Sequence, residues 1–157
     1  MCIRDRSNDA LNDSVTFTVH GLPAPQGSKR HIGRGVMVES SKNVKPWRQD
    51  VKFAALAAKP TDWDPAPAMS LSVVFRFTRP ATHYGKKGLR PSAPQHCTSA
   101  RNGDIEKLVR STNDALTGVL FDDDRQVVSL TATKRYCTES EQPGAVITLT
   151  ALTPNAS

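Results

Sequence analysis

Two segments of the chain alternate apolar and polar residues with the period of a β-strand. In residues 14–20 three apolar positions alternate with Thr and His, and in residues 69–77 the alternation is strict. Because successive side chains of a strand point to opposite faces, each pattern predicts a strand with one buried face. The second pattern is the clearer one, so we expect that strand at the centre of a sheet.

Two other segments repeat apolar residues at spacings of 3 and 4, which predicts amphipathic helices over residues 43–59 and 104–117. The first apolar face comprises Trp47, Val51, Ala54, Ala55 and Ala58, widened by Phe53 and Leu56. The second comprises Ile105, Leu108, Val109, Thr112, Ala115 and Leu116, with Gly118 as a candidate C-cap. We expect the aromatic residues on periodic faces, Trp47, Phe53, Phe75 and Phe77, to lie in the core.

The remaining segments complete an α+β pattern. Residues 126–136 and 145–152 predict two strands, and the turn between them predicts an antiparallel hairpin. A flexible basic loop is expected at residues 28–35, with a short strand after it, and a long polar loop at residues 79–100. A loop of that length inside a compact domain is often functional. We expect a small mixed or antiparallel sheet packed with two main helices.

Length and composition favour a single domain of 157 residues. The opening Met-Cys-Ile-Arg-Asp-Arg looks like a translated sequencing adapter, so residues 1–13 are expected to be non-native or disordered and residues 14–153 to form the domain. No apolar run is long enough for a membrane span or a secretory signal. The three cysteines are widely spaced and fit reduced thiols, so a cytoplasmic location is expected.

Charge is distributed unevenly along the chain. Residues 26–101 hold 14 Lys or Arg and 4 Asp or Glu, whereas residues 102–128 hold 3 basic and 6 acidic residues. Basic surfaces neutralise phosphates, and an acidic cluster can hold a metal ion where phosphates would otherwise be repelled. The pattern suits a metal-dependent nuclease, although a solvated basic surface beside an acidic loop would look the same.

The first acidic pair is Asp104 and Glu106. Side chains two positions apart on a helix point about 200° away from each other. The pair can therefore share a metal ion only if Asp104 precedes the helix. Gly103 would permit the necessary bend. Asp104 as a plain N-cap and Glu106 as a first-turn acid would explain the same residues.

The second acidic cluster is the run Asp122-Asp123-Asp124. A solvated turn would explain it. Three adjacent carboxylates repel one another by about 1 kcal/mol per pair at about 4 Å in water, however, and a bound cation is one way to offset that repulsion.

Taken together, these segments resemble the RusA family of Holliday junction resolvases. The resemblance lies in Asp104-Ile-Glu-Lys-Leu-Val-Arg, in Asp-Ala-Leu-Thr-Gly from Asp114, in Asp-Asp-Arg-Gln-Val-Val from Asp123, and in Lys134. It covers residues 104–134 well, and the Pro-containing segment at residues 21–26 with the basic loop after it more loosely. The spacing between the last two motifs makes the resemblance specific.

The resemblance implies a divalent metal site, for Mg²⁺ or for Mn²⁺ in its place. The implied ligands are Asp104, Glu106, Asp124 and the neighbouring Asp123. Glu106 departs from the family pattern, which has aspartate there. Arg110 stands where the family has a functional lysine, and it keeps the charge but cannot donate a proton at neutral pH. We therefore expect Arg110 to stabilise charge on the phosphate, and Asp114 one turn later could orient it by an ion pair.

The resemblance also implies a catalytic homodimer acting on branched DNA, four-way junctions above all, in recombination or repair and often in prophages. Expected phosphate contacts are Lys29, Arg30, Arg34, Lys86, Lys87, Arg101, Lys107 and Lys134. His96 fits a loop residue near DNA better than a metal ligand. Two alternatives stay open: a flap or fork nuclease on the same fold, and a DNA-binding module that has lost catalysis.

Overall fold

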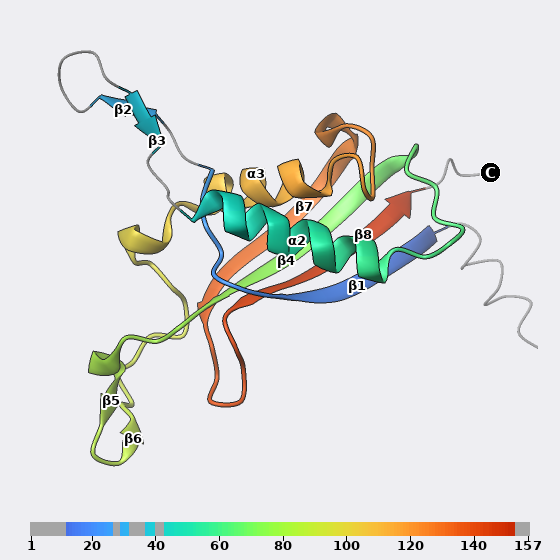
Figure 1. Ribbon diagram of the computed structural model, residues 1–157. Coiled ribbons are helices and arrows are strands. Elements are labelled where there is room, and N and C mark those ends of the chain that lie inside the picture. Colours follow the sequence, from blue (N-terminus) through green and yellow to red (C-terminus); the bar gives the residue numbers. More distant parts are fainter. Residues whose placement is uncertain (1–11, 27–28, 32–36, 40–42, 153–157) are drawn as a thin grey trace, which may run out of the picture.

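A computed structural model describes residues 12–26, 29–31, 37–39 and 43–152 (Figure 1). The strands are β1 (Asn12–His20), β2 (Lys29–His31), β3 (Met37–Glu39), β4 (Ala68–Phe77), β5 (Tyr84–Gly85), β6 (Gly88–Leu89), β7 (Val127–Tyr136) and β8 (Gly144–Leu152). The helices are α2 (Val44–Ala58) and α3 (Ile105–Leu116), with short 3-10 turns η1 (Ala81–His83), η2 (Ala100–Asn102) and η3 (Asp124–Gln126).

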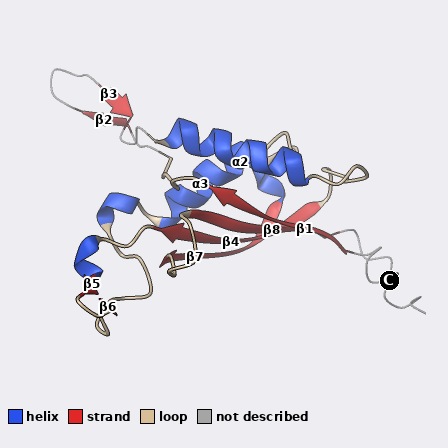
Figure 2. Cartoon of the chain, turned by 60° about the horizontal axis from the view of Figure 1, so that its bottom comes forward, coloured by secondary structure: helices blue, strands red, loops and turns tan. Residues whose placement is uncertain are grey.

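The main sheet has four strands in the order β1-β8-β4-β7. β8 pairs antiparallel with both β1 and β4, and β4 pairs parallel with the edge strand β7. Both helices lie on one face of this sheet, which Figure 2 shows from the side. The hairpins β2–β3 and β5–β6 project from the end of the molecule at which α2 and α3 begin (Figure 1). The expected α+β class, with a mixed sheet and two main helices, is confirmed.

The core lies between the sheet and the helix layer, where the periodic patterns placed it. Every second residue of β4 from Met69 to Phe77 is buried, and β4 is an inner strand of the sheet. Trp47 of α2 is fully buried, and its indole N–H donates to the Thr112 hydroxyl of α3 over 3.3 Å. Because the buried indole N–H and the buried hydroxyl are paired with each other, neither incurs the cost of an unmet hydrogen bond.

The apolar face of α2 is narrower than expected. Phe53 is 78% exposed and Leu56 is 52% exposed, so the prediction that Phe53 belongs to the core is wrong. The buried residues of α2 are Val44, Trp47, Val51 and Ala55. These follow one stripe at spacings of 3 and 4, whereas Phe53 lies on the far side of the helix, beyond the reach of the sheet.

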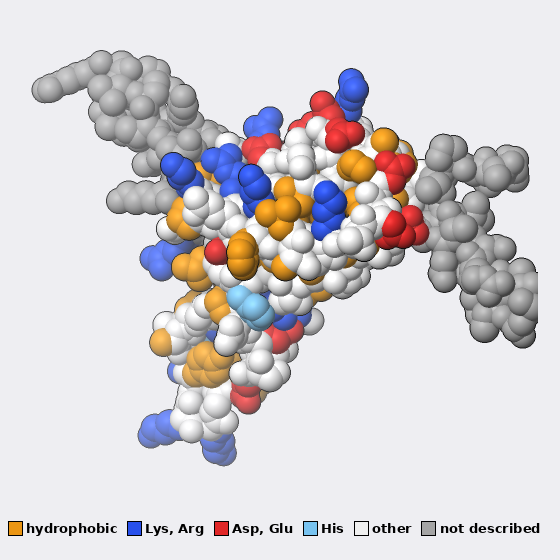
Figure 3. All heavy atoms as spheres, turned by 45° about the vertical axis from the view of Figure 1, so that its right-hand side comes forward, with side chains coloured by type: hydrophobic (Ala, Val, Ile, Leu, Met, Phe, Trp, Pro, Cys, Tyr) orange, Lys and Arg blue, Asp and Glu red, His pale blue; other side chains and the backbone are white. Residues whose placement is uncertain are grey.

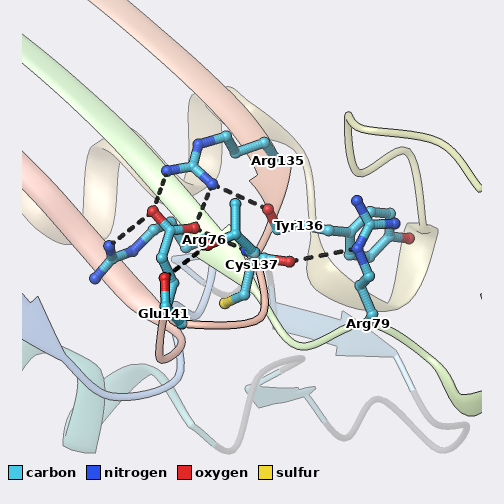
Figure 4. A network of polar contacts seen from close by, with 8 residues as sticks. Arg76, Arg79, Arg135, Tyr136, Cys137 and Glu141 are labelled. Carbon is cyan, nitrogen blue, oxygen red and sulfur yellow. Dashed lines mark hydrogen bonds and ion pairs between the residues drawn. The ribbon is translucent and has the colours of Figure 1, made fainter. Parts of the chain in front are cut away.

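The predicted hairpin between the last two strands is also wrong, because β4 lies between β7 and β8. The connection across the end of β4 is held by Glu141, which Figure 4 shows among its partners. Its carboxylate accepts two hydrogen bonds from Arg135 of β7, at 2.6 and 2.7 Å, and one from Arg76 of β4, at 3.3 Å. The same guanidinium of Arg135 holds the pKa of Glu141 well below its usual range. The seven residues between β7 and β8 are enough to step over one strand, about 10 Å.

The strand order has a second cause in the chain itself. β4, α3 and β7 form a strand–helix–strand unit, and the two strands of such a unit are parallel neighbours connected by a crossover. This places α3 over the β4–β7 half of the helix-covered face. Asp104 and Glu106 lie at the start of α3, and the aspartate run follows its end after five residues, so this unit positions the candidate site.

Candidate metal and DNA-binding site

The turn that presents the first acidic pair depends on Gly103. Its φ is +91°, in the left-handed region that favours glycine, and a Cβ added there would lie 2.6 Å from Cγ of Pro25. Lys134 of β7 donates from Nζ to the Gly103 carbonyl over 2.8 Å. Lys134 thus holds the turn before α3 from the neighbouring strand, a structural contact beside the phosphate role expected of it.

Asp104 has extended backbone (φ −77°, ψ 146°) and is the N-cap of α3, while Glu106 lies in the first turn. The expectation that Asp104 precedes the helix holding Glu106 is therefore confirmed. The Asp104 carboxylate accepts no capping hydrogen bond. Asp104 and Glu106 are both exposed, and they border an open pocket with His96 and Lys134. Their oxygens are thus not engaged in capping and face solvent.

The second cluster is a structured turn. The Asp123 carboxylate accepts the Arg125 backbone N–H over 2.9 Å as part of a capping box with Gln126. That hydrogen bond lowers the pKa of Asp123. Asp124, by contrast, occupies the first turn of η3 with an exposed side chain. The structure thus gives Asp123 a capping role and leaves Asp124 as the better candidate ligand.

Gln126 is a residue that the sequence reasoning missed. Its Oε1 accepts the backbone N–H groups of Asp122 and Asp123, at 2.9 and 2.8 Å. Its Nε2 donates to the carbonyls of residues 65–67, at 2.7 to 3.1 Å. One side chain therefore fastens the acidic turn to the connector between α2 and β4. The sequence signal was Asp123 followed three residues later by glutamine, which is the capping-box spacing.

The two acidic clusters lie at opposite ends of α3. Asp104 precedes the first turn of the helix near Lys134, whereas Asp124 borders a groove with Ala115 and Thr117 at the end of the helix. A helix of 12 residues is about 18 Å long. Among the residues that the structure describes, no three His, Cys, Asp or Glu side chains come together as a metal site. One chain thus presents the expected ligands in two separate groups.

Arg110 follows Glu106 by one helical turn on the exposed side of α3, which keeps it near the first acidic pair. Asp114, the residue expected to orient it, forms its ion pair with Arg48 of α2 instead, at 3.6 Å. The groove beside Asp114 also contains Lys45 and Lys52 of α2. These α2 residues were not among the expected phosphate contacts, although their spacing of 3 and 4 was visible in the sequence.

The expected phosphate contacts are distributed around the Asp104 end of the molecule. Lys86 and Lys87 are exposed at the turn of the β5–β6 hairpin, and Arg101 is exposed in η2. Lys107 is half-buried on α3. Lys29 and Arg30 belong to β2, but their side chains and the whole of Arg34 lie outside the described residues.

The fold and these groups define an α+β protein with two exposed carboxylate clusters and a basic surface, which suits the binding of phosphodiesters. The family model "Endodeoxyribonuclease RusA" matches residues 20–150. The chain belongs to the RusA endodeoxyribonuclease family, as its motifs had indicated.

A relative in Bacillus subtilis (strain 168), named "Uncharacterized protein YqaN", is 28% identical over 133 residues, which cover 83% of this chain and 92% of the relative. Family membership supports an endonuclease of Holliday junctions at the level of the family. None of the helices in the described ranges is long and apolar enough to span a membrane.

Proposed function

We propose that this chain is a Mg²⁺-dependent endonuclease that cuts branched DNA, four-way junctions above all, as a homodimer. The observation that carries the proposal is the exposed position of Asp104, Glu106 and Asp124 at the two ends of α3, in a chain of the RusA family.

The donor set fits a hard divalent cation. Carboxylate oxygens are the ligands that Mg²⁺ prefers, and the Asp104 carboxylate is not engaged in capping. A metal ion held by Asp104, Glu106 and Asp124 would supply a bound water of lowered pKa and neutralise charge on the scissile phosphate. Glu106 reaches one methylene further than an aspartate would, which the first helical turn accommodates because its side chain points to solvent.

The chain's own cations would act beside those ligands. Arg110 lies one turn from Glu106, and a guanidinium group can stabilise charge on a phosphate oxygen but is a poor proton donor to a leaving group. Lys134 holds the Gly103 carbonyl and so orients the turn that ends at Asp104. We assign Arg110 a charge-stabilising role and Lys134 a positioning role.

A second copy of the chain would unite the separated carboxylates. A two-fold axis perpendicular to α3 places the start of one helix beside the end of its partner, so Asp104 and Glu106 of one copy could meet Asp124 of the other. β7 offers an edge for this pairing, because no strand in the described part of the chain covers its outer side. Val128 and Leu130 on that strand are 63% and 50% exposed, as expected of a strand that pairs with another chain.

Mixing two inactive variants tests this assembly. Asp104→Asn and Asp124→Asn chains each lose every complete site. If the site joins two copies, their heterodimer regains one site, built from Asp104 of the second chain and Asp124 of the first, and nicks one strand of a junction. If each site lies within one chain, every site of the heterodimer stays defective and the mixture stays inactive.

Cleavage of a four-way junction with Mg²⁺ tests the function itself. The wild-type chain should cut the junction, Asp124→Asn should bind without cutting, and Asp122→Asn should cut normally because Asp122 is not an expected ligand. Binding without cutting by the wild type would favour a DNA-binding module, and Glu106→Asp would then show whether that substitution removed catalysis. Equal cutting of flaps and junctions would favour a broader nuclease.

A further inference from the structure

A row of cations runs along the exposed side of α2. Lys45, Arg48 and Lys52 follow one another at spacings of 3 and 4, which places them on one side of the helix. They line a groove of about 590 Å³, and its opposite wall includes Asp114 and Asp124. Figure 3 shows one face of the molecule on which Lys and Arg side chains gather, with Asp and Glu along its upper edge.

Helix stability does not account for this row. The start of a helix carries a partial positive charge, so Lys45 is unfavourably placed there, and no acidic residue occupies the first turn of α2. Asp50, the acidic residue of this helix, is not part of the groove, because its carboxylate lies against Gly21. The helix dipole and the basic side chains therefore add to one positive field.

Few contacts within the protein offset that field. Arg48 pairs with Asp114 at 3.6 Å and donates to Gln26 Oε1 at 3.1 Å. Among the described residues, Lys45 and Lys52 form no ion pair, and both are exposed. From Lys45 to Lys52 is seven residues, about 10 Å along the helix, or about three nucleotide steps of a duplex strand.

We propose that Lys45, Arg48 and Lys52 bind the phosphodiester backbone of the DNA strand that enters the groove beside Asp124. Lysine is a point charge with freely rotating donors, which suits contact with phosphates irrespective of base sequence. The row would draw the strand toward a wall of carboxylates that would repel it on their own. This inference rests on the proposed function, since it assumes that branched DNA is the substrate.

The salt dependence of junction binding tests whether the row contacts DNA phosphates. The full-length chain with Asp104→Asn, at the other end of α3, serves as the background so that the junction is not cut. In it Lys45→Gln and Lys52→Gln are compared, singly and together, with Lys59→Gln. Lys59 follows the same helix and is exposed but lies outside the groove, so it is a matched loss of charge. Equal melting temperatures confirm that the variants fold.

Each lysine lost from the row should reduce the magnitude of the slope of log association constant against log salt concentration by about 0.9. The loss of affinity caused by the substitution should therefore be about eightfold greater at 0.1 M salt than at 1 M salt. The loss should be the same for junctions of different sequence. Lys59→Gln, which keeps the charge of the row, should leave the slope unchanged.

The assignment of the row to phosphate binding is refuted if the Lys45→Gln/Lys52→Gln chain keeps the slope of the Asp104→Asn background. It is also refuted if the loss of affinity depends on base sequence. Failure of the proposed function is seen separately. If the unsubstituted chain with Asp104 intact neither binds nor cuts branched DNA, the nuclease proposal fails with the row. If it cuts junctions while the slopes are unchanged, only the assignment of the row fails.

Discussion

Replacing Gln126 by alanine should loosen the turn that carries Asp124. The side chain accepts two backbone N–H groups within the turn and donates to carbonyls of residues 65–67. A hydrogen bond of this kind contributes about 1 kcal/mol net, and Gln126 is half-buried, so water can replace part of the set. We expect Gln126→Ala to lower the free energy of unfolding by about 2–3 kcal/mol.

Urea denaturation followed by tryptophan fluorescence measures this loss. Trp63 is a suitable reporter, because its indole N–H donates to the Leu120 carbonyl over 2.7 Å, close to the turn. Cleavage of a four-way junction should fall by about a hundredfold, since a misplacement of about 1 Å can cost that much in rate. The expected result is thus a combined loss of stability and of cleavage.

Gln126→Glu is the matched control. It keeps the acceptor but replaces two N–H donors with a carboxylate that faces carbonyls and neighbouring aspartates. Burial against those groups raises the pKa of the new carboxyl, so the variant should be destabilised at pH 7 and recover as the pH falls through that raised value. An alanine variant within about 0.5 kcal/mol of wild type and with normal cleavage would refute the view that Gln126 holds the turn.

Three further predictions concern stability. Phe53→Ala should change the free energy of unfolding by no more than about 0.5 kcal/mol, whereas Phe75→Ala should cost about 3–5 kcal/mol in the same urea titration, and equal losses would contradict the burial of the two rings. Glu141→Gln should destabilise the protein at pH 7, because the pKa of Glu141 is depressed in the folded state. The stability that the carboxylate contributes is present above about pH 4.3 and is lost as the pH falls below that value, so the difference in free energy of unfolding between variant and wild type should narrow toward pH 2. Gly103→Ala should cost at least about 1 kcal/mol and reduce cleavage, because the added methyl would collide with Pro25, and unchanged melting and cleavage would show that the turn adapts.

The local elements and one detail of the site were accessible from the sequence. The alternation of β4 and the apolar stripe around Trp47 reflect the periods of a strand and a helix, which neighbouring residues set. The extended backbone at Asp104 followed from the requirement that it and Glu106 point to one side. The choice among the three aspartates came from the resemblance to a family, and the capping of Asp123 is compatible with it.

The neighbours of each strand and helix in the fold could not be derived from the sequence periods. Period 2 states that a strand has a buried face but not which strand lies beside it, so β7 and β8 were paired in chain order although β4 separates them. Likewise, Phe53 has the apolar character of a core residue, and only the width of the contact between α2 and the sheet leaves it in solvent.

The separation of the acidic clusters is the clearest case of what the tertiary structure alone decides. In the sequence, Asp104 and Asp124 are 20 residues apart and could meet after any reversal of the chain. The intervening residues form a rigid helix that runs along β7, and this keeps the two carboxylates at its opposite ends. The sequence by itself determined where carboxylates and cations stand along the chain. How they are distributed in space was decided by the packing of α3, because a helix of fixed rise holds its ends apart.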